Sequence, residues 1–412
     1  MSFRSSLQLL RPLLGAVLCL GVWAAEFPQD STPRARWGAL RVLHFGDSHT
    51  GSDPLQAVLR QGLADRFGDG GSGLGLPWGG RRRDGLGATS GWRRLTVTGK
   101  STDVLVGLGG AALESTRRGE RAWLHQPCGR LRLYLLRQPG GGTLRLTVDG
   151  RLLGDHNLNG AYPEVVVVDR NLGAASQARR VELQTLSDGK CRILGVALEG
   201  FRGAAYSPLS VNGAQASWLL RMPETLFLAQ MAPEAPDLII LAFGTNEAIG
   251  HDFDPGGYDR ALRQVLERCR RAAPQAALLL VAPPDAAFRN GRPGALDQVA
   301  AIQRAQAAAF GAGFVDLRQA MGAGAIRSWL ASGLAQNDLV HFTPQGYFRH
   351  AHVILTAALR CLEAVPRVPG IAPLAAPQGS PIYKSYGPDG TVILSSFPPP
   401  GEAPGPRTGS RK

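Results

Sequence analysis

Lysine is nearly absent from this 412-residue sequence, which holds only Lys100, Lys190, Lys384 and Lys412. The formal charge of +13 therefore comes almost entirely from arginine. Apart from Arg81-Arg82-Arg83, the arginines are scattered, and no nucleic-acid-binding motif accompanies them. We therefore expect no nucleic-acid partner. A basic surface does favour other anionic polymers.

Long apolar runs are also missing, except near the N-terminus. Leu13 to Ala25 is apolar, basic residues precede it at Arg4 and Arg11, and small residues end it. This pattern predicts a signal peptide over residues 1–25. The run is too short to span a bilayer comfortably, so we expect no stable membrane span in the mature chain. The protein is then periplasmic or otherwise exported.

Cysteine is scarce. Four cysteines would remain after cleavage of the signal peptide: Cys128, Cys191, Cys269 and Cys361. An exported protein can form disulfides, and four cysteines allow three pairings. We favour Cys128 with Cys191, because both lie in a β-rich stretch, and we expect the other two as buried thiols on helices. No cysteine pair has metal-ligand spacing, and we expect no metal or cofactor.

Two separated segments, 38–78 and 203–364, show strands alternating with helices. Expected strands lie at 40–45, 206–211, 237–243, 277–281 and 314–317, and expected helices at 53–67, 214–231, 255–272, 294–310 and 344–362. This alternation predicts an α/β domain with a parallel sheet covered on both faces. In such sheets, functional residues gather beyond the carboxyl ends of the strands.

The segment 79–202 between them has a different pattern. Short apolar runs separated by turn residues lie at 95–98, 104–108, 131–136, 144–148, 165–168, 181–185 and 193–198. Their spacing predicts an inserted β-sandwich. The tail over 365–412 is rich in proline and glycine, and two short apolar runs within it predict a small hairpin.

Polar residues follow the first expected strand. The tetrapeptide Gly46-Asp47-Ser48-His49 places a serine hydroxyl near the start of a helix, and Asp338-Leu339-Val340-His341 lies far downstream. This is the chain order of a nucleophile followed by its orienting acid and its base. Ser48 would attack, His341 would act as general base, and Asp338 would hold the imidazole. Alternatively, these residues are helix caps.

Two further polar turns follow apolar runs, Asn212-Gly213 and Gly244-Thr245-Asn246-Glu247. The Ser48 N–H, the Gly213 N–H and the Asn246 amide are the expected donors of an oxyanion hole. The alternative is ordinary turn chemistry.

As a set, these four blocks resemble the SGNH, or GDSL-type, esterases. The resemblance covers about 38–70 and 204–364, and implies a flavodoxin-like sheet with the catalytic and oxyanion residues named above. Many members have Asn-Asp where this chain has Asn246-Glu247, a change that keeps the asparagine donor. Within the family the chain is most similar to periplasmic peptidoglycan O-acetylesterases, which share the Gly-Asp-Ser-His and Gly-Thr-Asn-Glu blocks and a β-sandwich insert resembling carbohydrate-binding modules.

The resemblance implies a serine esterase that removes O-acetyl groups from a cell-wall glycan through an acyl-enzyme. Peptidoglycan acetylated on muramic acid is the expected substrate. Two alternatives stay open: a polysaccharide O-acetyltransferase on the same scaffold, and a glycan-binding protein without catalysis.

Overall fold

The structure is a computed structural model that describes residues 25–26, 39–75, 87–98, 101–250, 252–288, 294–363, 383–386 and 392–395. Nearly all of the predicted signal peptide, 1–25, and most of the tail, 365–412, lie outside these residues. Among the helices described, none is both long and apolar enough to cross a membrane.

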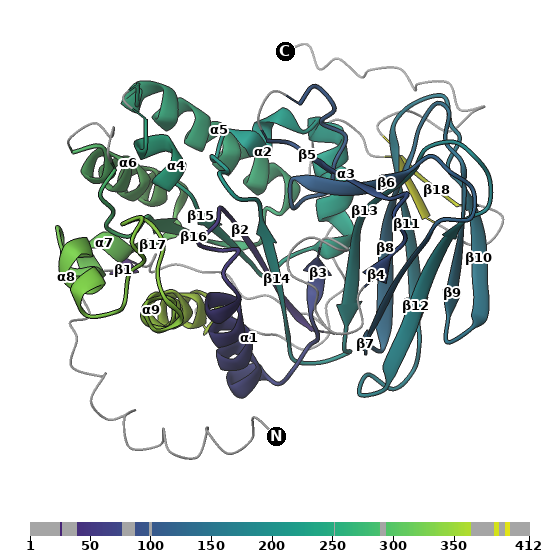
Figure 1. Ribbon diagram of the computed structural model, residues 1–412, viewed down its shortest axis with the longest axis horizontal. Helices are drawn as coiled ribbons and strands as arrows, with labels where there is room; N and C mark the ends of the chain where they lie inside the picture. The colour runs from purple at the N-terminus through teal and green to yellow at the C-terminus, as the bar shows by residue number, and fades with distance from the viewer. Residues whose placement is uncertain are drawn as a thin grey trace, which may run out of the picture.

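A six-stranded sheet forms the centre of the α/β part (Figure 1). Its strands, in spatial order, are β1 (Ala25–Glu26), β17 (Gly313–Asp316), β16 (Ala277–Ala282), β15 (Leu238–Ala242), β2 (Leu40–Gly46) and β14 (Ala204–Ser210). All neighbours pair in parallel except β1, which runs antiparallel to β17. The predicted flavodoxin-like parallel sheet is confirmed.

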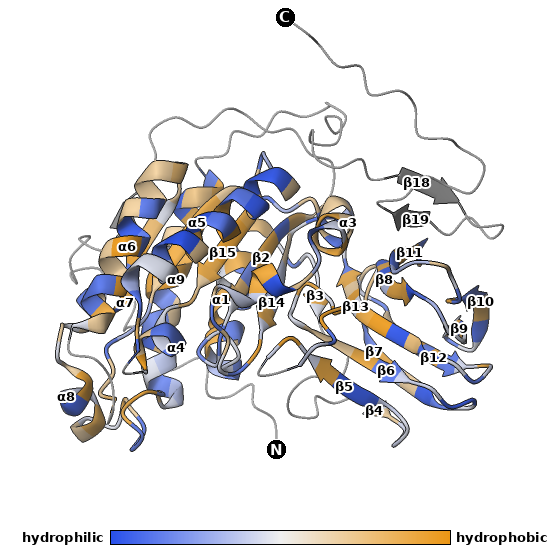
Figure 2. Ribbon diagram, turned by 90° about the horizontal axis from the view of Figure 1, so that it is seen from above, coloured by the Kyte–Doolittle hydropathy of each residue, from blue (hydrophilic) through white to orange (hydrophobic). Residues whose placement is uncertain are grey.

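Helices cover both faces of this sheet, because successive strand residues point to opposite sides. On β2, Val42 packs in one hydrophobic cluster with α1 (Asp53–Phe67) and α9 (Pro344–Glu363). Its neighbour Leu43 packs in another with helices from the opposite face. Those are α3 (Glu224–Glu234), α5 (Pro255–Ala272) and α6 (Ala295–Phe310). Figure 2 shows the apolar strands between helices of mixed polarity.

The helix predicted over 214–231 is two helices. The chain forms α2 (Trp218–Arg221), leaves the helical conformation at Met222, and resumes as α3. Pro223 causes the break, since a proline disfavours helical backbone in the residue before it. Short helices not predicted from the sequence are α4 (Thr245–Ala248), α7 (Leu317–Met321) and α8 (Ile326–Ala331).

Between α1 and β14 the chain builds two antiparallel sheets (Figure 1). One contains β10 (Arg151–Asn157), β9 (Thr143–Val148), β12 (Ala178–Thr185), β7 (Arg121–Pro127) and β4 (Gly87–Ala88). The other contains β18 (Tyr383–Tyr386), β19 (Val392–Ser395), β11 (Glu164–Asn171), β8 (Arg130–Arg137), β13 (Cys191–Glu199), β6 (Ala111–Ser115) and β5 (Arg93–Thr96), with β3 (Gly73–Gly75) beside β13. The tail thus adds two strands to the larger sheet. The strand predicted over 104–108 is wrong, because that segment is irregular.

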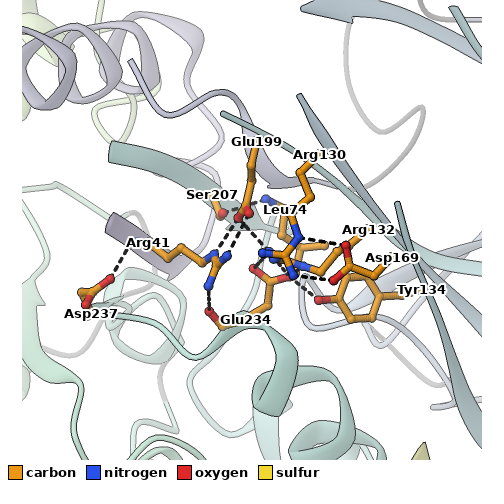
Figure 3. A network of polar contacts seen from close by, with 10 residues as sticks. All are labelled: Arg41, Leu74, Arg130, Arg132, Tyr134, Asp169, Glu199, Ser207, Glu234 and Asp237. Atoms are coloured by element: carbon orange, nitrogen blue, oxygen red, sulfur yellow. Dashed lines mark hydrogen bonds and ion pairs between the residues drawn. The ribbon is translucent and has the colours of Figure 1, made fainter. Parts of the chain in front are cut away.

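The larger sheet is buried on both faces. Leu133 and Leu135 of β8 point into a cluster shared with the smaller sheet, whereas Tyr134 and Leu136 join the cluster that contains α3. A network of buried charged residues connects the larger sheet to α3 (Figure 3). In it, Arg132 of β8 contacts Glu199 and Glu234, whose side chains are all at most 2% exposed.

The four cysteines within the described residues are free and buried, so the expected Cys128–Cys191 disulfide is not formed. Strand register explains this. On the paired strands β8 and β13, Arg130 lies opposite Glu199 and Leu136 opposite Arg192. The two cysteines therefore lie beyond opposite ends of the pair, more than about 20 Å apart along the strands, whereas a disulfide needs Cα atoms within about 7 Å.

Candidate active site

Ser48 lies in a turn between β2 and α1, at the carboxyl edge of the parallel sheet. The turn is tight beside Gly46, where an added Cβ would come within 2.1 Å of Thr50 Oγ1 and 2.9 Å of the Ala242 carbonyl oxygen. Only glycine fits there without displacing the turn. The N-cap of α1 is Ser52. Ser48 is therefore not the cap of this helix.

The side chains of Ser48, His341 and Asp338 form a continuous hydrogen-bonded line. Ser48 Oγ lies 2.8 Å from His341 Nε2, and His341 Nδ1 lies 2.7 Å from Asp338 Oδ2. An ionised carboxylate only accepts hydrogen bonds, so Nδ1 carries the proton and Nε2 accepts from the serine hydroxyl. His341 is about one-third exposed, which leaves the array open to a substrate.

The Asp338 carboxylate also fixes the backbone of the loop that carries His341. Asp338 Oδ1 accepts hydrogen bonds from Val340 N at 3.0 Å and His341 N at 2.9 Å. Leu339, between them, adopts a left-handed φ of 57°, which a non-glycine residue seldom does. Such strained backbone persists where the surroundings fix it, commonly at functional sites.

Asp338 stays ionised at neutral pH. Partial burial raises the pKa of its carboxyl, but hydrogen bonds from the His341 backbone, the imidazole and Val340 N outweigh burial and bring the pKa below its ordinary value. The residue before α9 is Thr343, whose Oγ1 accepts from Gly346 N. This threonine fills the capping role, so the capping alternative does not account for Asp338 and His341.

The expected oxyanion donors follow β14 and β15, the two strands that pair in parallel with β2, so they lie at the same edge of the sheet as Ser48. Gly213 follows β14, the strand paired beside β2, and has a positive φ of 77°. Neither its N–H nor that of Ser48 donates to another described residue. Asn246 differs, because its Nδ2 donates to Asp47 Oδ2 at 3.2 Å and to the Ala214 carbonyl at 3.0 Å. Both amide hydrogens of Asn246 therefore have acceptors here.

Asp47 is a further residue of the site, and the sequence pattern predicted no catalytic or binding role for it. It is only 2% exposed, and its Oδ1 accepts from His49 N at 2.9 Å. Burial raises the pKa of Asp47 to about 6, against the lowering effect of the His49 N–H and of nearby His341. Its position beside the nucleophile was visible in the sequence, but its burial was not.

His49 packs against the imidazole of His341, with ring centroids 5.3 Å apart. Its Nδ1 lies 3.2 Å from the Tyr347 hydroxyl. Burial above all, and then the neighbouring imidazoles of His341 and His350, lower the pKa of His49 to about 3. His49 is therefore neutral at physiological pH. Within the described part of the chain, no group of three or more His, Cys, Asp or Glu residues could hold a metal ion.

Comparison with known proteins gives a family match. The model of the GDSL-like Lipase/Acylhydrolase family matches residues 153–349. That range contains Gly213, Asn246, Asp338 and His341. Ser48 lies outside it, and the fold brings Ser48 to the same place. A comparison with curated proteins found no match.

Solved structures also resemble this chain. A peptidoglycan O-acetylesterase is 26% identical, with 80% of this chain and 93% of that chain covered and a TM-score of 0.67. An active-site mutant of a family two carbohydrate esterase from Clostridium thermocellum is 14% identical, with coverage of 67% and 99% and a TM-score of 0.33. A lipase/acylhydrolase from Enterococcus faecalis is 17% identical, with coverage of 37% and 75% and a TM-score of 0.31. The last two are too distant to support further conclusions.

Proposed function

We propose that this chain, a carboxylic ester hydrolase of the GDSL-like lipase/acylhydrolase family, removes O-acetyl groups from a cell-wall glycan. The acetylated sugar is muramic acid of peptidoglycan. One observation carries the proposal: the unbroken Ser48–His341–Asp338 line of hydrogen bonds at the carboxyl edge of the sheet. The similarity to a peptidoglycan O-acetylesterase supports the choice of substrate.

In the first step, Ser48 Oγ attacks the acetyl carbonyl carbon while His341 Nε2 takes the hydroxyl proton. The 2.8 Å separation suits this transfer. The imidazolium that forms carries its second N–H toward Asp338, whose negative charge stabilises it. Asp338 keeps its charge throughout, in keeping with its lowered pKa.

Negative charge develops on the former carbonyl oxygen. The N–H groups of Ser48 and Gly213 have no acceptor among the described residues, so both are available to this oxyanion. The Asn246 amide is the third predicted donor, and it would exchange or share one of its bonds to Asp47 and Ala214. Loss of one such donor typically slows catalysis by about 10²–10³-fold.

The intermediate collapses when His341 returns its proton to the sugar oxygen, which leaves as an alcohol. Water then attacks the acetyl-Ser48 ester, again with His341 as general base, and releases acetate. Transfer to a glycan hydroxyl in place of water would make the enzyme an acetyltransferase.

We assign β4 to β13, which make up most of the two antiparallel sheets, to an inserted β-sandwich module over 79–202, with the hydrolase over 38–78 and 203–364. The hydrophobic cluster that the two sheets share supports this assignment. A glycan-binding role for the module, and export through the 1–25 signal peptide to the periplasm, complete the proposal.

The test is acetate release from O-acetylated peptidoglycan by the purified mature chain. Wild-type protein should release acetate, and Ser48→Ala should be slower by several orders of magnitude with an unchanged circular dichroism spectrum. Acetyl groups recovered on an added glycan acceptor would indicate the transferase. Glycan binding without any acetate release would contradict the proposed function.

A further inference from the structure

We infer that Glu247 is a positioning residue for the oxyanion hole, which acts by fixing the loop 213–216 that carries the Gly213 donor. This inference rests on the proposed function for its catalytic consequence, but the contacts that carry it are independent of any substrate. Glu247 itself does not touch the reacting atoms; it acts through the backbone of the loop.

Three successive loop residues are bound by the pair Asn246 and Glu247. Asn246 Nδ2 donates to the Ala214 carbonyl at 3.0 Å, and Gln215 Nε2 donates to the Asn246 carbonyl at 3.1 Å. Ala216 N donates to Glu247 Oε1 at 2.8 Å. The start of α4 thus holds the loop at each residue after Gly213.

Gly213 needs such support from outside. It is exposed, its φ of 77° is positive, and its nearest possible Cβ contact, with Trp218, is 4.0 Å away. Gly213 has no side chain, and no neighbouring atom packs closely enough against it to fix the direction of its N–H. The hydrogen bonds of residues 214–216 therefore determine where this donor points, and an oxyanion donor contributes only when it is already in place.

The Glu247 carboxyl is enclosed where it makes this contact. Its Oε2 atom is buried and has no hydrogen-bond partner among the described residues. Burial of an ionised carboxylate without full hydrogen bonding costs far more than burial of a neutral side chain of the same shape. Burial raises the pKa of Glu247 to about 7, so the neutral acid is well populated at neutral pH. Glutamine is therefore the matched substitute: it keeps an acceptor for Ala216 N and carries no charge.

The experiment compares Glu247→Ala, Glu247→Gln and wild type in hydrolysis of 4-nitrophenyl acetate. Glu247→Ala should lower kcat by about 10²-fold with KM nearly unchanged, as expected for a misplaced oxyanion donor. Glu247→Gln should stay within a few-fold of wild type. Thr185→Val is the control, since it removes buried hydrogen bonds within the insert, to Arg117 and Glu120. It should lower the melting temperature and leave kcat unchanged.

Amide hydrogen exchange gives a readout that does not depend on activity. The Ala216 amide and its neighbours should exchange faster in Glu247→Ala and at the wild-type rate in Glu247→Gln. If Glu247→Ala does not fold, Gln215→Ala takes its place, with faster loop exchange and lower kcat expected. Wild-type kcat and exchange in Glu247→Ala, or equal losses in the alanine and glutamine variants, would overturn the inference. Full activity in Ser48→Ala would instead refute the proposed function and leave the exchange result to stand.

Discussion

At the scale of single residues, the site depends on a chain of hydrogen bonds that ends in one negative charge. Asp338 is ionised, His341 is oriented by it, and the hydroxyl of Ser48 faces the free ring nitrogen. A hydroxyl is a weak nucleophile unless a base takes its proton during attack. The carboxylate therefore matters through the tautomer it enforces, because the opposite tautomer would present an N–H to the serine.

Asp338→Asn tests that dependence. The asparagine oxygen can still accept from Val340 N and His341 N, so the loop should keep its shape. The amide group no longer enforces the productive tautomer, and kcat should fall by about 10³–10⁴-fold. Ester hydrolysis kinetics measure this, with Asp65→Asn on the exposed side of α1 as control. Near-wild-type kcat would show that the acid has no part in catalysis.

Glu247 gives a prediction for stability as a function of pH. Its pKa is about 7 in the folded protein and near 4.5 when unfolded, so the folded state holds the proton more tightly. The resulting stabilisation is complete below pH 4.5 and is lost as pH rises through 7, by roughly 3 kcal/mol in all. Glu247→Gln should lack this loss. Urea unfolding of both proteins at pH 4.5 and 7.5 measures the difference, and equal pH dependence would contradict it.

The sequence predicted the polar residues of the site but not their surroundings. Ser48, Gly213, Asp338 and His341 each follow an apolar run or stand in a spaced motif, and these patterns are local. The partners of Asn246 are not local: Asp47 lies 199 positions away and Ala214 lies 32 positions away. Which amide hydrogens remain free depends on the fold, so a sequence pattern cannot show it.

At the scale of elements, the site exists because β2 and β15 are adjacent and parallel. Their carboxyl ends bring Ser48 and Asn246 to one edge, at the position where strand order reverses in such sheets. The sequence predicted α1, α5 and α9 within one or two residues, since α5 and α9 have strong helical periodicity and α1 starts with an acidic residue followed by a proline. It missed β6, β7 and β10, whose apolar content is weak and whose pairing depends on distant strands.

A buried polar network joins β8 to α3 (Figure 3). Glu234 accepts from Arg132 and from the Tyr134 hydroxyl. Without Glu234, Glu199 alone would face Arg132 and Arg41, and one buried positive charge would be uncompensated. Glu234→Ala should therefore lower the free energy of unfolding by about 3 kcal/mol, measured by urea denaturation.

The exposed pair Arg145–Asp155 on β9 and β10 provides the control for that measurement. Asp155→Ala should leave the free energy of unfolding nearly unchanged, because solvent screens this pair. An equally small effect of Glu234→Ala would mean that the buried network does not hold β8 against α3.

At the scale of the whole molecule, the positive charge is consistent with the proposed substrate, an anionic polymer. The chain carries a formal charge of +13, and attraction between exposed charges weakens as salt shortens the screening length. KM for O-acetylated peptidoglycan should therefore rise between 0.05 and 0.5 M salt. KM for uncharged 4-nitrophenyl acetate should not. Parallel salt series measure both values, and an equal response of the two substrates would exclude a role for long-range charge.

The whole mechanism depends on the Ser48 oxygen as the nucleophile. A serine-directed fluorophosphonate, followed by mass spectrometry of the digested protein, would identify the reactive residue. We expect one adduct, on the peptide that contains Ser48, formed in wild type, absent in Ser48→Ala and much slower in His341→Ala. An adduct on another residue, or full ester hydrolysis by Ser48→Ala, would contradict it.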